Sequence, residues 1–97
     1  LKMIESEKVL ERKLVNAVKA KGGLCIKLLS NHFIGLPDRL CLLPGGIIFF
    51  VEIKTTGLKP SKVQTHIHSK IAGLGFKVYT IDNSLIIKLL TGDDVRY

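Results

Sequence analysis

A short turn between two apolar runs restricts this chain more than any other feature of its sequence. The tripeptide Pro-Gly-Gly at positions 44–46 separates residues 38–43 from residues 47–54. Proline and glycine supply the backbone conformations of tight turns, and short apolar runs on either side of them indicate a β-hairpin. Residues 47–51 are apolar on both faces, so we expect this strand to lie inside a sheet with cover on both sides.

A helical pattern precedes the hairpin at residues 5–20. Apolar side chains recur there at the spacing of one helix face, at Leu10, Leu14, Ala17 and Val18. Gly22 and Gly23 follow, and glycine readily adopts the left-handed conformation that ends many helices. Residues 24–29 are then predicted to form a strand, and residues 30–37 a loop.

A second helix and a further strand follow the hairpin. Ser61 and Gln64 have the spacing of a capping box, which predicts that a helix begins there. Residues 76–81 have the character of a strand, whereas residues 85–90 fit a short helix or a strand equally well. The order of helix, three strands, helix and strand indicates one α/β domain over residues 1–97, with a central mixed sheet flanked by helices.

The composition excludes several classes of protein. The 97 residues are 46% apolar, which suits one compact domain with a core, and no apolar run is long enough to cross a bilayer. No secretory signal is visible, and Cys25 and Cys41 lie in apolar segments, so we expect free thiols and a cytoplasmic location. The net charge of +7 favours a polyanionic partner such as DNA, although lysines also keep basic proteins soluble.

The hairpin is predicted to bring three charged side chains to one face. If its loop has three residues, counting outward from the loop places Asp38 directly opposite Glu52. Directly opposed residues point to the same face, with Cβ atoms about 5 Å apart. Lys54 lies two positions beyond Glu52 and therefore shares that face. A change of one residue in the loop would break this pairing.

Two carboxylates opposite each other destabilise a sheet unless something offsets their repulsion. A divalent cation does so by binding oxygen from both, and Mg²⁺ commonly takes one or two carboxylates with waters and phosphate oxygens. We therefore expect Asp38 and Glu52 to hold Mg²⁺ or Mn²⁺, with the Val51 carbonyl as a further ligand. Lys54 would then stabilise charge on a scissile phosphate or orient the attacking water. The alternative for Glu52 and Lys54 is a surface ion pair worth under about 1 kcal/mol.

A carboxylate from the first helix completes the predicted site. Glu7 and Glu11 lie four positions apart, beside the apolar stripe rather than on the lysine-rich side. An acid on the face that packs against a sheet needs a specific partner, such as a metal-bound water. Helix capping is the alternative, because acids favour the first turn, and it fits Glu7 better than Glu11. These arguments leave open which of the two belongs to the site.

These segments together resemble the VRR-NUC family, the virus-type replication-repair nucleases within the PD-(D/E)XK superfamily. The likeness extends from Glu7 to about Asp82. The matching pieces are ERKLV at 11–15, GGLCIK at 22–27, GLPDRL at 35–40, FVEIK at 50–54, GLKPSKVQ at 57–64 and GFKVY at 75–79. Each piece alone is a weak signal, whereas their order and spacing together are specific.

The resemblance implies a restriction-endonuclease-like αβββαβ core and Mg²⁺- or Mn²⁺-dependent DNA cleavage. It maps the superfamily's acidic and basic residues onto Asp38, Glu52 and Lys54. It also maps the helix glutamate onto Glu11, and Gln64 onto a position near the active site. Small stand-alone relatives look like phage or bacterial homodimers that act on four-way (Holliday) junctions in DNA repair. Cleavage of flaps, nicks or ordinary duplex, or a basic DNA-binding module without catalysis, are the alternatives.

Several polar side chains outside this constellation are predicted to contact DNA. They are Lys27, Asn31, His32, Lys59 and Lys62. The last two flank the beginning of the second helix, which itself favours anions, whereas the asparagine and histidine also fit an ordinary polar loop. His66 and His68 lie two positions apart on the second helix and point in different directions, so they do not form a zinc pair.

Overall fold

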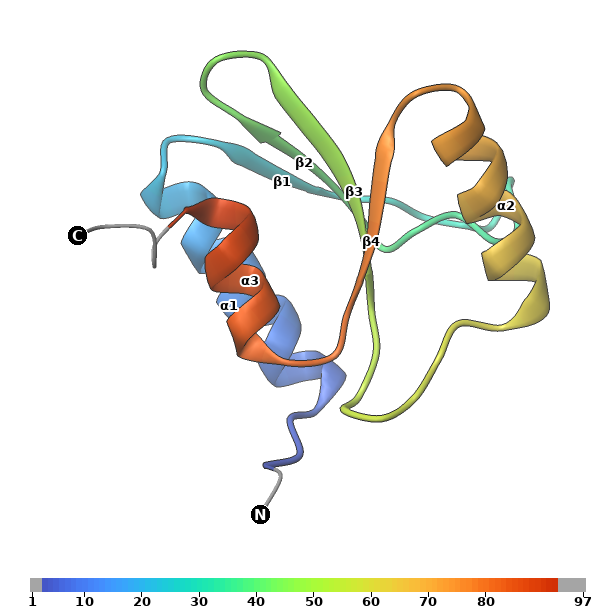
Figure 1. Ribbon diagram of the computed structural model, residues 1–97, viewed down its shortest axis with the longest axis horizontal. Coiled ribbons are helices and arrows are strands. Elements are labelled where there is room, and N and C mark those ends of the chain that lie inside the picture. The colour runs from blue at the N-terminus through green and yellow to red at the C-terminus, as the bar shows by residue number, and fades with distance from the viewer. Residues whose placement is uncertain (1–2, 93–97) are drawn as a thin grey trace.

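The computed structural model describes residues 3–92, which form three helices and one four-stranded sheet (Figure 1). The elements are α1 (Glu7–Ala20), β1 (Leu24–Lys27), β2 (Arg39–Leu43), β3 (Ile47–Ile53), α2 (Lys62–Gly73), β4 (Lys77–Ile81) and α3 (Ser84–Thr91). The predicted order of helix, three strands, helix and strand is confirmed. The segment that fitted a helix or a strand equally well is the helix α3, which Asn83 caps by accepting a hydrogen bond from the Ile86 N–H.

The sheet has the strand order β1-β2-β3-β4 and is mixed, because β1, β2 and β3 are antiparallel neighbours and β4 runs parallel to β3. In the hairpin Leu43 pairs with Ile47, so the loop has the three residues that the sequence predicts. Gly45 and Gly46 have φ angles of 89° and 77°, a region that residues with side chains rarely adopt. The turn therefore requires glycine, and it fixes the register of the hairpin.

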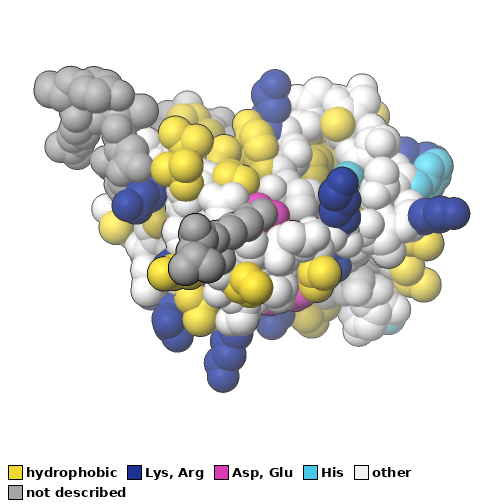
Figure 2. Space-filling view, turned by 60° about the horizontal axis from the view of Figure 1, so that its bottom comes forward, with side chains coloured by type: hydrophobic (Ala, Val, Ile, Leu, Met, Phe, Trp, Pro, Cys, Tyr) yellow, Lys and Arg dark blue, Asp and Glu magenta, His cyan; other side chains and the backbone are white. Residues whose placement is uncertain are grey.

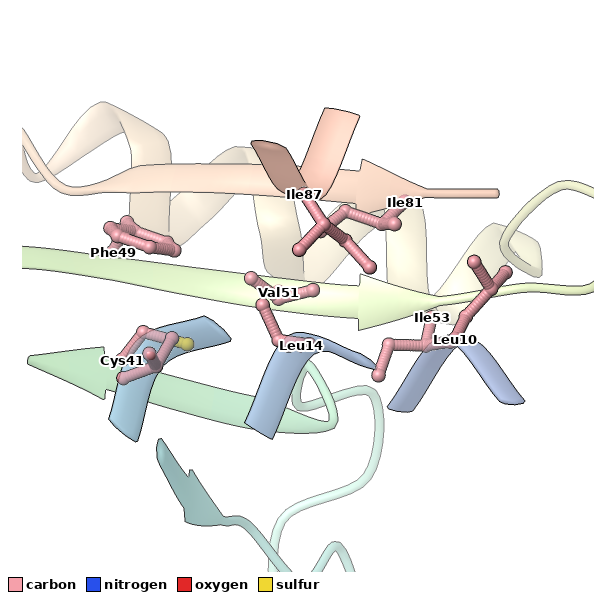
Figure 3. Close-up of a cluster of buried hydrophobic side chains, with 9 residues drawn as sticks. Leu10, Leu14, Cys41, Phe49, Val51, Ile53, Ile81 and Ile87 are labelled. Carbon is pink, nitrogen blue, oxygen red and sulfur yellow. The ribbon is translucent and has the colours of Figure 1, made fainter. Parts of the chain in front are cut away.

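The helices lie on both faces of the sheet (Figure 1): α1 and α3 pack together against one face, and α2 lies on the other. The core fills the space between the sheet and the pair α1 and α3, where apolar side chains from both layers converge (Figure 3). Its members are Leu10, Leu14, Val18, Cys41, Phe49, Val51, Ile53, Ile81 and Ile87. Strand β3 thus directs every second side chain from Phe49 onward into this core, and the intervening ones to the opposite face of the sheet.

The expectation that β3 is covered on both sides is wrong, although β3 does lie inside the sheet. Phe49 and Val51 are buried by α1 and α3, but on the other face Ile48 is 44% exposed. The reason is that α2 covers only the part of that face where β3 ends. The strand register leaves an open sheet face beyond α2, formed by Leu24, Ile26, Leu40, Leu42, Ile48 and Phe50.

The two thiols are free, as predicted. Cys25 and Cys41 pair across β1 and β2 with their sulfur atoms 3.8 Å apart. The neighbouring thiol of Cys25, and after it burial, raise the pKa of Cys41, which keeps this thiol protonated. None of the helices within the described residues combines the length and apolar character that crossing a membrane requires.

Candidate active site

Glu52 is the centre of a polar cluster on the α2 face of the sheet. It is 2% exposed, although its neighbours Val51 and Ile53 point to the opposite face and into the core. Its Oε2 accepts a hydrogen bond of 2.8 Å from Nε2 of Gln64, and Nζ of Lys54 lies 3.5 Å from the same oxygen. The fold therefore brings Glu52, Lys54 and Gln64 together.

The side-chain amide of Gln64 is fixed by hydrogen bonds at both its oxygen and its nitrogen. The hydroxyl of Ser61 accepts from the Gln64 backbone N–H, and the Ser61 backbone N–H donates to Oε1 of Gln64 at 2.9 Å. This is the capping box that the spacing predicts. It leaves the amide nitrogen of Gln64 free to donate to Glu52, so the start of α2 and the buried carboxylate are joined through one side chain.

Asp38 lies one residue before β2, next to Arg39, which pairs with Val51. Continued by one residue, the same register places Asp38 opposite Glu52, as the sequence predicts. Its Oδ2 accepts a hydrogen bond of 2.8 Å from the backbone N–H of Ile53, which fixes the carboxylate against β3. The loop before it passes tightly under α2, because a Cβ atom at Gly35 would lie 2.7 Å from Ile67 Cγ1. Glycine at this position therefore allows the approach that delivers Asp38 to the site.

The charge on Glu52 is unfavourable beside Asp38, because Lys54 and Gln64 do not fully offset burial and the second carboxylate. Burial, and after it the charge of Asp38, raises the pKa of Glu52 from its ordinary 4.5 to about 7, against the lowering effect of Lys54 and Gln64. Its Oε1 is buried and has no hydrogen-bond partner. A buried carboxylate oxygen without a partner, beside a second carboxylate, is the donor set that a hard divalent cation fits.

His68 is a member of this cluster that the sequence reasoning did not place there. Its Nε2 lies 3.9 Å from Oε1 of Glu52, and burial lowers the pKa of the imidazole. His66, two positions earlier on the same helix, is exposed. The signal that could have found His68 is its spacing of four residues from Gln64, which puts both on one face of α2.

Glu11 has a different position from the predicted one. Its carboxylate pairs with Nε of Arg39 at 2.9 Å, and Arg39 pairs with Val51 in the sheet and so points to the α1 face. Across residues 3–92, no three His, Cys, Asp or Glu side chains lie close enough together to hold a metal ion. The predicted grouping of Glu11 with Asp38 and Glu52 is therefore not what the structure shows. Glu7, the other candidate, is exposed in the first turn of α1.

The side chains predicted to contact DNA are all exposed, namely Lys27, Asn31, His32, Lys59 and Lys62. Figure 2 shows lysine and arginine side chains spread over the viewed face, with few acidic side chains among them. The side chain of Val51 lies in the core, and its carbonyl stays a predicted ligand. The side chains predicted to contact DNA are thus accessible to solvent.

Comparison with known proteins places this geometry among nucleases. No family model matches the chain. It is 38% identical over 84 residues to "Putative nuclease p44" of Acyrthosiphon pisum secondary endosymbiont phage 1, a match that covers 87% of this chain and 90% of that protein. A solved structure described as a VRR_NUC domain matches with a TM-score of 0.83 and 27% identity, covering 93% of this chain and 99% of the other. Both likenesses include nearly the whole chain, and with it the hairpin and α2 that form the cluster.

Proposed function

This chain belongs to the VRR-NUC family of nucleases, and from that premise we propose that it is a metal-dependent DNA endonuclease with Asp38, Glu52 and Lys54 at its active site. One observation carries the proposal. Glu52 is 2% exposed, stands opposite a second carboxylate and has one oxygen without a partner. Such an arrangement is unfavourable in the absence of a cation and favourable in its presence.

Mg²⁺ or Mn²⁺ is the proposed cofactor, held by Asp38 and Glu52. The protein offers two carboxylates, and hard divalent cations of this kind complete their coordination with waters, backbone oxygen and phosphate oxygens. The bound ion would polarise the scissile phosphate and lower the pKa of a coordinated water. We keep the Val51 carbonyl as a proposed further ligand.

The surrounding side chains have separate roles in this proposal. Lys54, with its ammonium 3.5 Å from Glu52, stabilises negative charge on the phosphate as the bond to the leaving oxygen breaks. Gln64 holds Oε2 of Glu52 and keeps the carboxylate oriented. The hydrogen bond from Ile53 N–H does the same for Asp38.

DNA is the proposed partner, because a net charge of +7 and exposed basic side chains attract a polyanion. Lys27, Lys59 and Lys62 are proposed phosphate contacts, and Asn31 and His32 proposed contacts from the loop before Asp38. Binding should then weaken steeply as the salt concentration rises, since each neutralised phosphate releases counterions.

Within this class we propose four-way junctions as substrate and a homodimer as the active form. Resolving a junction needs two cuts related by a twofold axis, and a dimer with one active site per subunit supplies them. Cleavage of flaps, nicks or ordinary duplex keeps the same chemistry. A DNA-binding module without catalysis is the remaining alternative, and the intact acidic pair argues against it.

One experiment tests the whole proposal. Labelled four-way, flap, nicked and linear DNA are incubated side by side with the purified protein and Mn²⁺, with EDTA as control. We expect junction cleavage only with the metal, and its loss in Asp38→Asn and Glu52→Gln, both of which keep the size of the side chain. Light scattering gives the oligomeric state of the same samples.

Two outcomes would contradict the proposal in different ways. Full activity of both variants would show that the acidic pair is not the active site. Binding of DNA without cleavage of any substrate, with Mn²⁺ present, would favour the non-catalytic module.

A further inference from the structure

We propose that His68 is a positioning residue for the active-site carboxylate: its Nε2–H donates to Oε1 of Glu52, while Gln64 holds Oε2. The inference rests on the proposed function, because it assigns His68 a part in preparing the Asp38 and Glu52 pair for a divalent cation. It concerns a side chain that the sequence reasoning left without a role.

Two unsatisfied atoms face each other in this part of the molecule. Among the described side chains, Oε1 of Glu52 and Nε2 of His68 are buried polar atoms without any hydrogen-bond partner. They lie 3.9 Å apart, and the His68 side chain is 11% exposed. An N–H···O hydrogen bond has a length of about 2.7 to 3.2 Å. A movement of about 1 Å by either side chain would therefore satisfy both atoms, and buried polar atoms without a partner destabilise a fold.

Helix α2 places two side chains with N–H groups, Gln64 and His68, beside the carboxylate of Glu52. Gln64 and His68 are one helical turn apart and lie on the same face of α2. The capping box at Ser61 fixes where this helix begins, and thereby which face turns towards β3. Gln64 already donates to Oε2, so His68 is placed beside the oxygen that remains. His66 lies between them in sequence but is exposed to solvent.

His68 also lines a groove on the same face of the molecule as α2. The groove has a volume of about 370 Å³ and lies between α2 and β4, two elements that stand side by side in Figure 1. His68 lines it together with Thr65, Ser69 and Thr80, and Thr80 is the β4 residue paired with Glu52. The imidazole thus lies 3.9 Å from the carboxylate and at the same time forms part of the groove wall.

Each carboxylate oxygen has two lone pairs, so Oε1 can accept a hydrogen bond from His68 and still bind a cation. A carboxylate held at both oxygens then cannot rotate away from that cation. Partners of this kind typically change metal affinity or activity by 10- to 100-fold when they are removed. We therefore expect His68→Ala to weaken Mn²⁺ binding by about tenfold, a change that does not depend on DNA. His68→Gln keeps an N–H donor at a similar reach and should recover most of this loss.

The test measures Mn²⁺ affinity of the DNA-free protein by calorimetry for the parent chain, His68→Ala, His68→Gln and the control His66→Ala. We expect a strong loss of Mn²⁺ affinity only in His68→Ala, and an affinity equal to that of the parent in the exposed control His66→Ala. Cleavage kinetics of the same set should show a lower kcat for His68→Ala with an unchanged KM for DNA. Melting temperatures without metal report whether each variant is folded.

The outcomes separate this inference from the function on which it rests. Parent-like Mn²⁺ affinity in His68→Ala would overturn the inference and leave the nuclease proposal intact. Equal losses in His68→Ala and His68→Gln would also overturn it, because packing rather than donation would then be the cause. A parent chain that binds no Mn²⁺ would remove the proposed function and the role of His68 together.

Discussion

Gln64 donates a hydrogen bond of 2.8 Å from its side-chain nitrogen to Oε2 of Glu52. The oxygen of the same amide accepts from the backbone N–H of Ser61 and so completes the cap of α2. A local helix signal and an active-site contact therefore share one side chain. The position of the buried carboxylate depends on where the second helix begins.

Replacement of Gln64 by alanine should affect stability and metal binding together. The change removes one half of the capping box and one partner of a buried carboxylate, so we expect a loss of about 1 to 2 kcal/mol in unfolding free energy. Ser61→Ala is the matched control, because it removes the other half of the cap and leaves the Glu52 contact in place. Urea denaturation and Mn²⁺ titration of both variants check this. Equal Mn²⁺ affinities in Gln64→Ala and Ser61→Ala would show that the contact between Gln64 and Glu52 does not contribute to metal binding.

Much of the site could be predicted because the length of the hairpin loop determines which residues of its two strands lie opposite each other. A three-residue loop fixes the register, and the alternation of a strand then decides which side chains share a face. Asp38, Glu52 and Lys54 follow from that count alone. The capping box at Ser61 and Gln64 was equally visible, because it depends only on residues three positions apart.

The remaining features depend on contacts that the sequence does not contain. A helical wheel gives the face on which Glu11 lies but not that Arg39 would stand opposite it. The carboxylate of Glu5 accepts hydrogen bonds from the backbone and the hydroxyl of Ser84, which is far away in sequence. The apolar content of β3 likewise could not reveal that α2 stops short of Ile48. Partners across a fold are set by packing, whereas spacing describes only one element at a time.

The raised pKa of Glu52 predicts how stability depends on pH in the absence of metal. The folded chain holds this proton up to about pH 7, whereas the ordinary pKa is 4.5. The contribution of Glu52 to stability is therefore complete below pH 4.5 and is lost as the pH rises through 7. Glu52→Gln cannot ionise, so in EDTA at pH 8 it should be more stable than the parent by at most roughly 3 kcal/mol.

Urea denaturation of both proteins between pH 5 and pH 8 checks this expectation. The advantage of Glu52→Gln should shrink towards pH 5, and Mn²⁺ at pH 8 should stabilise the parent but not the variant. A constant difference across this pH range would mean that Glu52 does not titrate there.

Removal of the Lys54 ammonium should lower the cleavage rate far more than the metal affinity. The ammonium lies 3.5 Å from Glu52, and its proposed role is to stabilise charge that develops on the phosphate. Loss of one such group typically costs a factor of about 100 to 1,000 in kcat. Lys54→Met keeps the length of the side chain, and Lys59→Ala is the control, since Lys59 is exposed and a proposed phosphate contact. Single-turnover kinetics should show a slow chemical step in Lys54→Met, whereas Lys59→Ala should only bind DNA more weakly. Strong loss of Mn²⁺ affinity with an unaltered rate at saturating metal would reverse the assignment.

Glu11 should prove to be a structural residue rather than a metal ligand. Its carboxylate is 2.9 Å from Nε of Arg39 on the face of the sheet opposite Glu52, and both side chains are partly buried. Glu11→Gln keeps a hydrogen-bond acceptor but removes the charge, so we expect a loss of about 1 kcal/mol in stability and a cleavage rate within about twofold of the parent. Glu7→Gln, measured beside it, tests the other acid of the same helix, which is exposed in the first turn. The informative comparison is rate against stability at saturating Mn²⁺. A loss of cleavage in Glu11→Gln with an unchanged free energy of unfolding would contradict this prediction. Because Glu11 pairs with Arg39 on the other face of the sheet, its carboxylate would then have to leave Arg39 and reach the acidic pair when metal and DNA bind.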